Sequence, residues 1–536
     1  MRVVASILFA MSTVTAVAIA PEKGAALRAA LLLLGGLGAA WALAWAGLDR
    51  RRRPRVLRAA AWGAAGLAAL IGGWYLLGVV APGVVPDAVN ANVAAAGLAV
   101  LLPLGVALVI GSPSPSSARR AAEEEAELGL GGPGRGAPGR VAAAVLVLVG
   151  AGALVATGSV GAWLGLLLGA LYGGWWALRP TVGRDHRMVE RGIDGALVVL
   201  AVAGVGAWWV MAGRGADLLA SPGARPSLWH DALGLIGDYR YTGAGLRSTM
   251  MVLSTYVYLL HVGYISHVHN LYLALALEQG LPGLIAFLFL VGTALAALVR
   301  AQRRQVVAPA MQGAIAAALV ALLAHGLVDA ALYASRLMPL IFLPIGLAWA
   351  AGGRVHGRTV EARGRRLLVA MTPLAALALF FVLPNARAAW QANLGAVAQS
   401  QAELGIYAWP AWPYQDALRR NPMVDLDGAI ARYQAALALD PANVTANRRL
   451  GQIALSRGDV PAAQGWLAAA YAAAPDERAT RMLLGEVYAL QGEVDQARAL
   501  LAGVNGEQGQ FEARRWWIGE TATAEQQAWY DAALGQ

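Results

Sequence analysis

Long apolar runs, separated by short polar segments, dominate the first two-thirds of the chain. About eleven of them are long enough to cross a bilayer, which takes roughly 20 residues of helix. These runs lie near residues 3–20, 26–48, 57–80, 93–111, 142–158, 161–178, 193–212, 281–299, 307–328, 338–352 and 367–384. The pattern predicts an all-α fold in which residues 1–384 form a polytopic bundle of membrane helices.

After residue 384 the pattern changes to shorter amphipathic helices with a 34-residue period. Three sets of residues repeat at this spacing: Ala429, Ala463 and Ala497; Gly451 and Gly485; Pro441 and Pro475. This is the tetratricopeptide pattern, in which small residues let paired helices approach and prolines close each unit. We therefore expect residues 385–536 to form an α-solenoid tail, with repeats at about 425–504. Such a tail either binds a protein partner, positions a glycan chain, or braces the neighbouring domain.

Composition agrees with a membrane protein, because 58% of the residues are hydrophobic and 14% are charged, against about 25% charged in soluble domains. The chain has no cysteine, which excludes disulfides and thiolate metal sites. Its net charge of +10 comes almost wholly from arginine, since Lys23 is the single lysine. Arginine abundance by itself does not indicate a polyanion partner, and no nucleic acid is expected.

The positions of the arginines predict the orientation in the membrane. Every second loop is arginine-rich, and cytoplasmic loops are the ones that carry such an excess. The rich loops follow the runs that end near residues 48, 111, 178, 299 and 352. This places the N-terminus in the cytoplasm, and both the loop 213–280 and the tail outside the cell membrane. Within the cytoplasmic loops, residues 112–140 are rich in Ser, Pro, Gly and charge, which predicts a disordered linker.

The outer loop 213–280 is too long for a simple connector, so a functional role is expected. It contains Arg225, Arg240 and Arg247, although positive charge is otherwise sparse on this face. Five of the seven histidines also lie at or near the face, namely His230, His261, His267, His269 and His325. Imidazole accepts protons near neutral pH and guanidinium holds phosphate in a fork. Together they suit displacement of a diphosphate leaving group by a hydroxyl.

The sharpest candidate is the pair His269-Asn270, followed after nine residues by Gly280 and Gly283. A polar pair at the boundary of a membrane helix costs free energy unless a site needs it. His269 is the candidate base, and Asn270 is expected either to cap the following helix or to contact substrate. The two glycines are expected to allow a break between a surface helix and the next span.

Neighbouring polar residues have both structural and functional readings. In an extended segment His267 shares a side with His269 and would join it at the substrate. A metal site at these histidines is not favoured, because no carboxylate is near on the same face. Glu278 is expected to be a helix-end residue. His325 and Asp329, four residues apart, are expected on one helix face, either as a structural hydrogen-bonded pair or in contact with substrate.

Three blocks of the sequence resemble one family. HNLYLALALEQGLPG at 269–283 matches a His-[Asn/Ser]-x9-Gly-x-x-Gly motif; RPSLWHDALGLIGDYRYTGAGL at 225–246 and HGLVDAALYASRLMPL at 325–340 resemble two further blocks. Over about residues 140–350 the chain resembles the O-antigen ligase and polymerase superfamily of bacterial cell-surface glycan enzymes, which includes related protein O-oligosaccharyltransferases. Some members also carry a tetratricopeptide tail.

The resemblance implies a C-type glycosyltransferase that needs neither a metal nor another cofactor. The donor would be a glycan linked to undecaprenyl diphosphate, and the acceptor a hydroxyl of a lipid sugar, a glycan or a protein. By motif position, His269 would be the base, Arg225 a diphosphate ligand and Arg247 a weaker candidate. Where many members carry Ser-Arg-Gly, this chain has Val160 in the middle position, so that Arg247 or Arg240 would substitute. The alternatives are a transporter or flippase of polyprenyl-linked glycans, and a non-catalytic scaffold built around the tail.

Overall fold

The fold is helical throughout the part of the chain that the computed structural model describes. The described residues are 1–49, 51–81, 89–110, 137–178, 225–254, 256, 267–305, 307–353, 384–405, 419–502, 515 and 522–535. Within these ranges every regular element is an α-helix or a 3-10 helix, and no strand occurs. The predicted all-α class is confirmed. The expected linker at 112–140 lies outside the described residues up to its last turn, where a helix begins.

Eight described helices are long and apolar enough to span a membrane, which makes this a multi-pass membrane protein. They are α1 (Arg2–Ile19), α2 (Lys23–Ala46), α3 (Arg53–Val80), α4 (Ala91–Ile110), α6 (Ala137–Thr157), α7 (Val160–Leu178), α11 (Leu271–Arg304) and α12 (Pro309–Gly326). The runs expected at 193–212 and 367–384 lie outside the described residues. The run at 338–352 forms a 3-10 turn, η3 (Met338–Phe342), and the short helix α13 (Leu343–Gly352).

Small residues bring the membrane helices together, as expected where lipid tails compete with side-chain packing. Along α7, Gly165, Gly169 and Gly173 repeat at every fourth position and face α12. A Cβ atom built on Gly169 would lie 2.5 Å from the carbonyl oxygen of Ala317, so a larger side chain would push the two helices apart. This contact holds α7 against the end of α12 that leads into the polar site described below.

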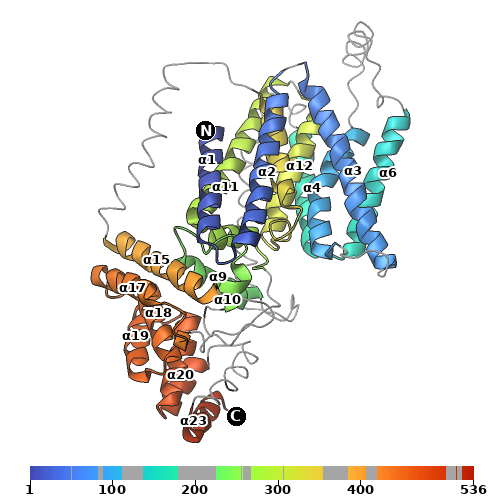
Figure 1. Ribbon diagram of the computed structural model, residues 1–536. Helices are drawn as coiled ribbons and strands as arrows, with labels where there is room; N and C mark the ends of the chain where they lie inside the picture. Colours follow the sequence, from blue (N-terminus) through green and yellow to red (C-terminus); the bar gives the residue numbers. More distant parts are fainter. Residues whose placement is uncertain are drawn as a thin grey trace, which may run out of the picture.

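The arginine-bearing ends of several helices lie together at one end of the bundle. Arg2 at the start of α1 lies 3.5 Å from the carbonyl oxygen of Gly353, where α13 ends. Arg53, at the start of α3, bonds the carbonyl of Gly47 at 2.8 Å. At the opposite end, the side chain of Gln401 in the tail donates to the carbonyl of Ile19 at 3.1 Å. The tail therefore packs on the end of the bundle that lies away from these arginines (Figure 1).

The tail is a stack of antiparallel helix pairs. Its helices are α15 (Pro384–Leu404), α17 (Asp427–Leu439), α18 (Val444–Ser456), α19 (Val460–Ala473), α20 (Arg478–Leu490), α21 (Val494–Leu501) and α23 (Ala524–Leu534). Gly451 packs on Leu467, and Gly485 packs in the same way on Leu501, 34 residues further on in each case. The predicted close approach of paired helices at small residues is thus found at the repeat period.

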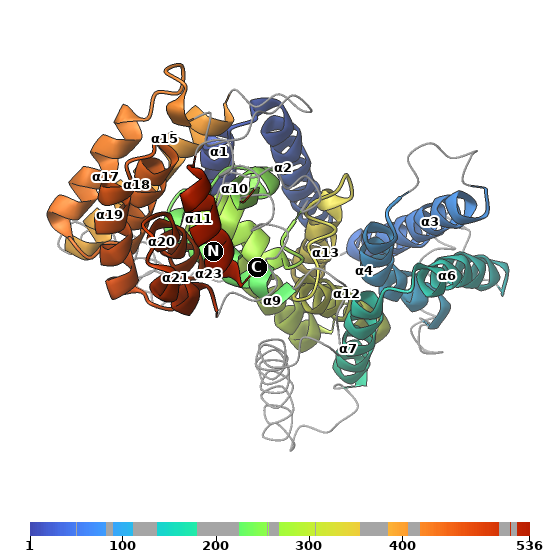
Figure 2. The same ribbon diagram turned by 90° about the horizontal axis from the view of Figure 1, so that it is seen from below.

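Two short helices of the predicted outer loop lie between the bundle and the tail. They are α9 (Arg225–Asp238) and α10 (Thr249–Ser254), drawn in green in Figure 1 above the orange and red tail. Seen from below, the tail lies near α1, α9, α10 and α11, whereas α3 and α6 are on the far side of the bundle (Figure 2). The polar site is built where α9, the start of α11 and the end of α12 meet.

Candidate functional site

A break inside α11 separates a short surface helix from the membrane span. Gly280 has φ of 71° and ψ of 175°, which is non-helical, although the helix continues on both sides. Residues other than glycine essentially never adopt these backbone angles. Residues 271–279 therefore form a short helix before the span, as the sequence predicts from Gly280. Gly283 lies past the break, packed on the side chain of Gln279.

The Gly-x-Gly segment at residues 243–245 docks on this break. The backbone N–H of Ala244 donates to the carbonyl of Leu277 at 2.7 Å, and that of Gly245 to Glu278 at 3.1 Å. A Cβ atom on Gly243 would lie 2.4 Å from the carbonyl oxygen of Glu278. Glycine is required here because the two backbones touch. Two of the sequence blocks, 225–246 and 269–283, are thus one structural unit.

Asn270 begins α11 and ties it to the loop after α12. Its Oδ1 accepts hydrogen bonds from the backbone N–H groups of Tyr272 at 2.9 Å and Leu273 at 3.0 Å, which is the expected N-cap. Its Nδ2 donates to the carbonyl of Leu327 at 2.9 Å. All three of these bonds are structural. The position of His269, directly before this cap, is consequently fixed against both α11 and the segment 327–337.

His267, His269 and Asp329 form one cluster. The two imidazole rings lie 4.2 Å apart between centroids. Nδ1 of His269 is 3.5 Å from one carboxylate oxygen of Asp329, and Nε2 of His267 is 3.4 Å from the other. Asp329 is buried, whereas the His269 side chain is 30% exposed and open to a reactant. A carboxylate thus lies behind a partly accessible imidazole, which is the arrangement of a general base with its orienting acid.

The electrostatics of Asp329 follow from this contact. Burial by itself would raise the pKa of its carboxyl group, because a charge is costly away from water. Hydrogen-bonding contact with His267 and His269, and their positive charge when protonated, outweigh burial and hold the pKa of Asp329 below its ordinary value. Asp329 therefore carries a negative charge at neutral pH.

His325 and Asp329 are joined through the backbone, where the N–H of Asp329 donates to the carbonyl of His325 at 2.9 Å, whereas their side chains share no hydrogen bond in the described structure. α12 ends at Gly326, so Asp329 is past the helix, and its carboxylate makes ion-pair contacts with His267 and His269. His325 is buried instead against α7, where a Cβ atom on Gly165 would lie 3.3 Å from its own Cβ. The expectation that no carboxylate lies near His267 and His269 is wrong, because the carboxylate of Asp329 contacts both side chains.

Of the two arginines expected to substitute at Val160, Arg247 contacts the segment 327–337. Its backbone has φ of 63°, its side chain is exposed, and its Nη1 donates to the carbonyl of Ala334 at 2.7 Å. Ala334 belongs to the same segment, 327–337, that carries Asp329. Arg240 instead donates to the carbonyl of Gly237 at 3.1 Å, at the end of α9. Val160 starts α7, and a Cβ atom on the next residue would touch Val328 in this segment.

Three other predicted residues differ in how far the structure describes them. Arg225 is the first residue of α9, and its side chain is not among the described atoms. His261 lies outside the described residues. Glu278, expected at a helix end, is buried one turn before the span and accepts a hydrogen bond from Thr249 at 2.7 Å.

Trp229, which contacts the histidine segment, was missed from the sequence. The indole Nε1 of Trp229 in α9 donates a 2.7 Å hydrogen bond to the carbonyl of Val268, the residue between His267 and His269. The Arg-x-x-Leu-Trp spacing of its block was the signal that could have found it. Arg336 is exposed two residues after Ala334, and it adds a further cation to the segment 327–337.

The described fold and site define a class: a multi-pass helical membrane protein whose solenoid tail packs on α9, the helix that contacts the histidine segment. Comparison with protein families adds two matches. An O-antigen ligase model matches residues 144–288, and a tetratricopeptide repeat model matches residues 425–479. The chain thus carries an O-antigen ligase region followed by tetratricopeptide repeats, which confirms the predicted resemblance. No curated protein and no solved structure matches the chain significantly.

The family match supports a role as a membrane glycan ligase or polymerase, with a lipid-linked glycan as its substrate. The matched region includes Val160, Arg225, His269 and Gly280, and it ends before Asp329. The carboxylate partner of His269 therefore comes from the structure, not from the family match.

Proposed function

We propose that the protein is a glycosyltransferase that moves a glycan from undecaprenyl diphosphate to an acceptor hydroxyl. The observation that carries the proposal is the contact between His269 and Asp329. It joins the 269–283 block to the 325–340 block at a partly open imidazole. The O-antigen ligase match supports the substrate class, since this region contains His269.

The geometry assigns separate tasks to the two imidazole nitrogens of His269. Nδ1 faces Asp329 and carries the hydrogen, so that Nε2 keeps its lone pair for the acceptor. The acceptor oxygen attacks the anomeric carbon of the donor sugar as its proton passes to Nε2. The bond between that carbon and the diphosphate oxygen breaks, and the polyprenyl diphosphate leaves with the electron pair. Asp329 stabilises the imidazolium that forms.

Arginines neutralise the charge that gathers on the departing diphosphate. Arg247 is held over the segment 327–337 by its bond to Ala334 and remains exposed. Arg225, at the start of α9, is the second proposed ligand, and Arg336 lies on the same segment as Asp329. A guanidinium placed in advance stabilises this charge without reorganisation during the reaction. His267, His325 and Asn270 shape the site around these groups.

Backbone strain supports a functional constraint at two of these residues. His269 has φ of 48° and Arg247 has φ of 63°, in the left-handed region that residues other than glycine rarely adopt. Each such residue costs of order 1–3 kcal/mol, and strain of this kind gathers at active sites. His269 and Arg247 are the proposed base and the proposed diphosphate ligand.

The arrangement of charge supports an extracytoplasmic site in the inner membrane. Arg2 and Arg53 lie at the end of the bundle opposite to the tail. Because positive charge favours the cytoplasmic side, the tail and the His269 cluster would face outward. Within this proposal, residues 1–384 form the membrane domain and residues 385–536 the tail.

The decisive experiment is transfer by the purified protein in lipid, with a defined polyprenyl-diphosphate oligosaccharide and a panel of lipid, glycan and protein acceptors. Products are identified by mass, and release of the polyprenyl diphosphate is followed in parallel. We expect wild-type protein to form product and His269→Ala to lose it. His230→Ala is the matched control, since His230 is exposed on α9.

Full transfer by His269→Ala would remove the base assignment. Transbilayer movement of the donor without diphosphate release would favour a transporter or flippase instead. The acceptor that gains mass distinguishes a ligase, a polymerase and a protein glycosyltransferase.

A further inference from the structure

One face of the solenoid tail is occupied by the chain's own helix α9. The helices α15, α18 and α20 are the first members of the three stacked pairs, and all three lie against α9 or the residues that follow it. The concave face of such arrays is the usual binding surface for a partner. In this chain the row formed by α15, α18 and α20 already contacts α9 and the residues that follow it, from within the molecule.

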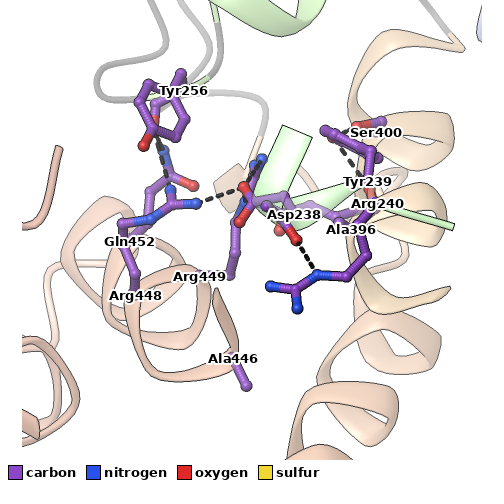
Figure 3. A network of polar contacts seen from close by, with 12 residues as sticks. Asp238, Tyr239, Arg240, Tyr256, Ala396, Ser400, Ala446, Arg448, Arg449 and Gln452 are labelled. Atoms are coloured by element: carbon purple, nitrogen blue, oxygen red, sulfur yellow. Dashed lines mark hydrogen bonds and ion pairs between the residues drawn. The ribbon is translucent and has the colours of Figure 1, made fainter. Parts of the chain in front are cut away.

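Two arginines of α18 close on one carboxylate of α9. Nε and Nη2 of Arg449 lie 3.0 and 2.7 Å from Oδ2 of Asp238, and Arg448 bonds the same oxygen (Figure 3). All three side chains are at most 1% exposed. Arg448 also pairs with Glu477 at 3.2 Å and lies over the ring of Tyr256. Charges this deeply buried are tolerated only with such complete pairing.

A second ion pair lies one helix pair further along the tail. Nε of Arg478, at the start of α20, bonds Oδ1 of Asp231 at 2.9 Å, and its Nη2 bonds the other carboxylate oxygen. Because the guanidinium of Arg478 bonds both carboxylate oxygens of Asp231, the pair fixes the orientation of the two side chains as well as the distance between them. Asp231 lies in the middle of α9, seven residues before Asp238, so that the tail grips α9 at two points.

Uncharged bonds extend the contact to the corner after α9. The hydroxyls of Tyr239 and Ser400 are hydrogen bonded, and Figure 3 shows Tyr239 pointing toward α15. Oδ1 of Asn393 accepts from the backbone N–H of Tyr241 at 2.8 Å, and its Nδ2 donates to Thr242 at 2.7 Å. This corner leads directly into the Gly-x-Gly segment that docks on the break at Gly280.

The gripped helix in turn holds the histidines. Trp229 lies two residues before Asp231 and bonds the carbonyl of Val268, between His267 and His269. At the other end of α9, the carbonyl of Arg240 accepts from the N–H of Leu281 at 2.8 Å, just past the helix break. The contacts therefore run without a gap from α20 and α18, through α9, to the backbone on both sides of the short helix 271–279.

We propose that the tail positions the segment 267–269 through α9, as part of the catalytic unit. On this proposal, the face of the tail formed by α15, α18 and α20 does not recruit a partner. The inference rests on the proposed function for what is being positioned. Asp231, Asp238, Arg448, Arg449 and Arg478 are its positioning residues. An ion pair of this kind specifies one arrangement of two elements, because any other arrangement leaves a buried charge unpaired.

The test is a double-mutant cycle on Asp231 and Arg478 in the full-length protein in lipid. Arg478→Gln leaves Asp231 unpaired and Asp231→Asn leaves Arg478 unpaired, whereas the double variant pairs two neutral amides. Arg457→Gln is the matched control, because Arg457 is exposed on the same array. The readouts are kcat and KM for the lipid-linked donor, and hydrogen exchange of residues 267–270 followed by mass.

We expect each single variant to lower kcat at least about tenfold, with KM changed less than about threefold, and to speed exchange at residues 267–270. The double variant should recover most of both, and Arg457→Gln should match wild type. Tyr239→Phe, which removes the hydroxyl that bonds Ser400 and the carbonyl of Ala396, provides a milder variant if the charge variants fail to fold. Tyr239→Phe should lower kcat and speed exchange at residues 267–270 by smaller factors than the charge variants.

Unchanged exchange at residues 267–270 and unchanged kcat, while exchange rises in α9 and α20, would overturn the proposal. Normal transfer by the purified variants with loss confined to cells would overturn it in favour of partner recruitment. If wild-type protein transfers no glycan, the proposed function fails, but the exchange experiment still decides whether the tail orders the histidine segment.

Discussion

The indole of Trp229 and the backbone carbonyl of Val268 are joined by a hydrogen bond of 2.7 Å between helix α9 and the segment that carries both site histidines. Both residues are buried. The bond fixes the carbonyl between His267 and His269, and hence the backbone on which both imidazoles depend. A buried carbonyl that loses such a donor costs about 1–3 kcal/mol.

Trp229→Phe tests this bond because it keeps an aromatic ring and removes the donor. We expect kcat for glycan transfer to fall about tenfold, which corresponds to roughly 1.4 kcal/mol in the barrier, with a smaller change in KM. Steady-state kinetics in lipid measure the effect. Trp466→Phe, at a partly exposed position of the tail, is the control and should behave as wild type. An unaltered kcat in Trp229→Phe would show that this bond does not position the histidines.

Asp329→Asn tests the orienting carboxylate while preserving its size. The amide cannot stabilise an imidazolium, so we expect kcat to fall by about 10²-fold or more. The pKa of Asp329 is held below its ordinary value of about 3.9. Its charge is thus present above that pH and is lost only as the pH falls further. The loss of kcat should therefore be present in full at about pH 8, where the wild-type carboxylate is charged. An unchanged kcat of Asp329→Asn at this pH would contradict the assignment.

Much of the fold could be predicted from the sequence because it depends on local pattern. Apolar runs predict the described membrane helices to within a few residues, and Gly280 predicts the break in α11. The repeat period places Gly451 where paired helices approach each other, and Gly451 packs there on Leu467. In each case the physical cause, such as helix length in a bilayer or the absence of a Cβ atom, is a property of one short segment.

The partners of the site could not be predicted in this way. The four-residue spacing of His325 and Asp329 suggested a helix face, but the helix ends between them, and the carboxylate turns to residues 60 positions earlier. Arg448 and Arg449 look like solvent-facing charges on an amphipathic helix. Their burial depends on Asp238, about 210 residues away, and no periodicity in either segment records that contact.

The cluster of His267, His269 and Asp329 also predicts a response to metal ions. Its possible ligand atoms all lie within 4.8 Å of one another, and two imidazoles with a carboxylate suit Zn²⁺. Metal binding would take the electron pairs that a base needs. We expect transfer to survive EDTA and to be inhibited by Zn²⁺. For His267→Gln, with each rate normalised to the uninhibited rate of that variant, the half-inhibiting Zn²⁺ concentration should be at least about tenfold higher than for wild type. Loss of transfer in EDTA that Zn²⁺ restores would instead indicate a metal-dependent enzyme.

Asp238 should make the stability of the assembled protein sensitive to acid. Burial by itself would raise the pKa of Asp238, but the charges of Arg448 and Arg449 outweigh it and lower the pKa. A lowered pKa in the folded protein adds stability that is present above the unfolded value of about 3.9 and is lost as the pH falls through the folded value.

Asp238→Asn removes this contribution at every pH and leaves two buried guanidinium groups short of a counter-charge. We expect a cost of about 3–5 kcal/mol, measured as a lower unfolding temperature in detergent. The difference from wild type should be constant between about pH 5 and pH 8 and should shrink below about pH 4. Asp495→Asn, at an exposed position, should change little. A difference that grew toward acid pH would contradict the direction of the pKa shift.

Gly280→Ala tests whether the break in α11 carries the site. The backbone angles at Gly280 belong to a region that costs other residues about 1–3 kcal/mol. A Cβ atom there would also lie 2.8 Å from the backbone N of Gly243 and the carbonyl oxygen of Tyr241, which cannot move aside as a flexible side chain would. We expect a lower unfolding temperature and a loss of transfer, because the Gly-x-Gly segment would be pushed off the helix that His269 precedes.

Gly292→Ala in the same α11 is the control, since a Cβ atom there meets nothing within 4 Å, and helix propensity favours alanine by about 1 kcal/mol. Equal behaviour of the two variants would show that the break is not needed to hold the site.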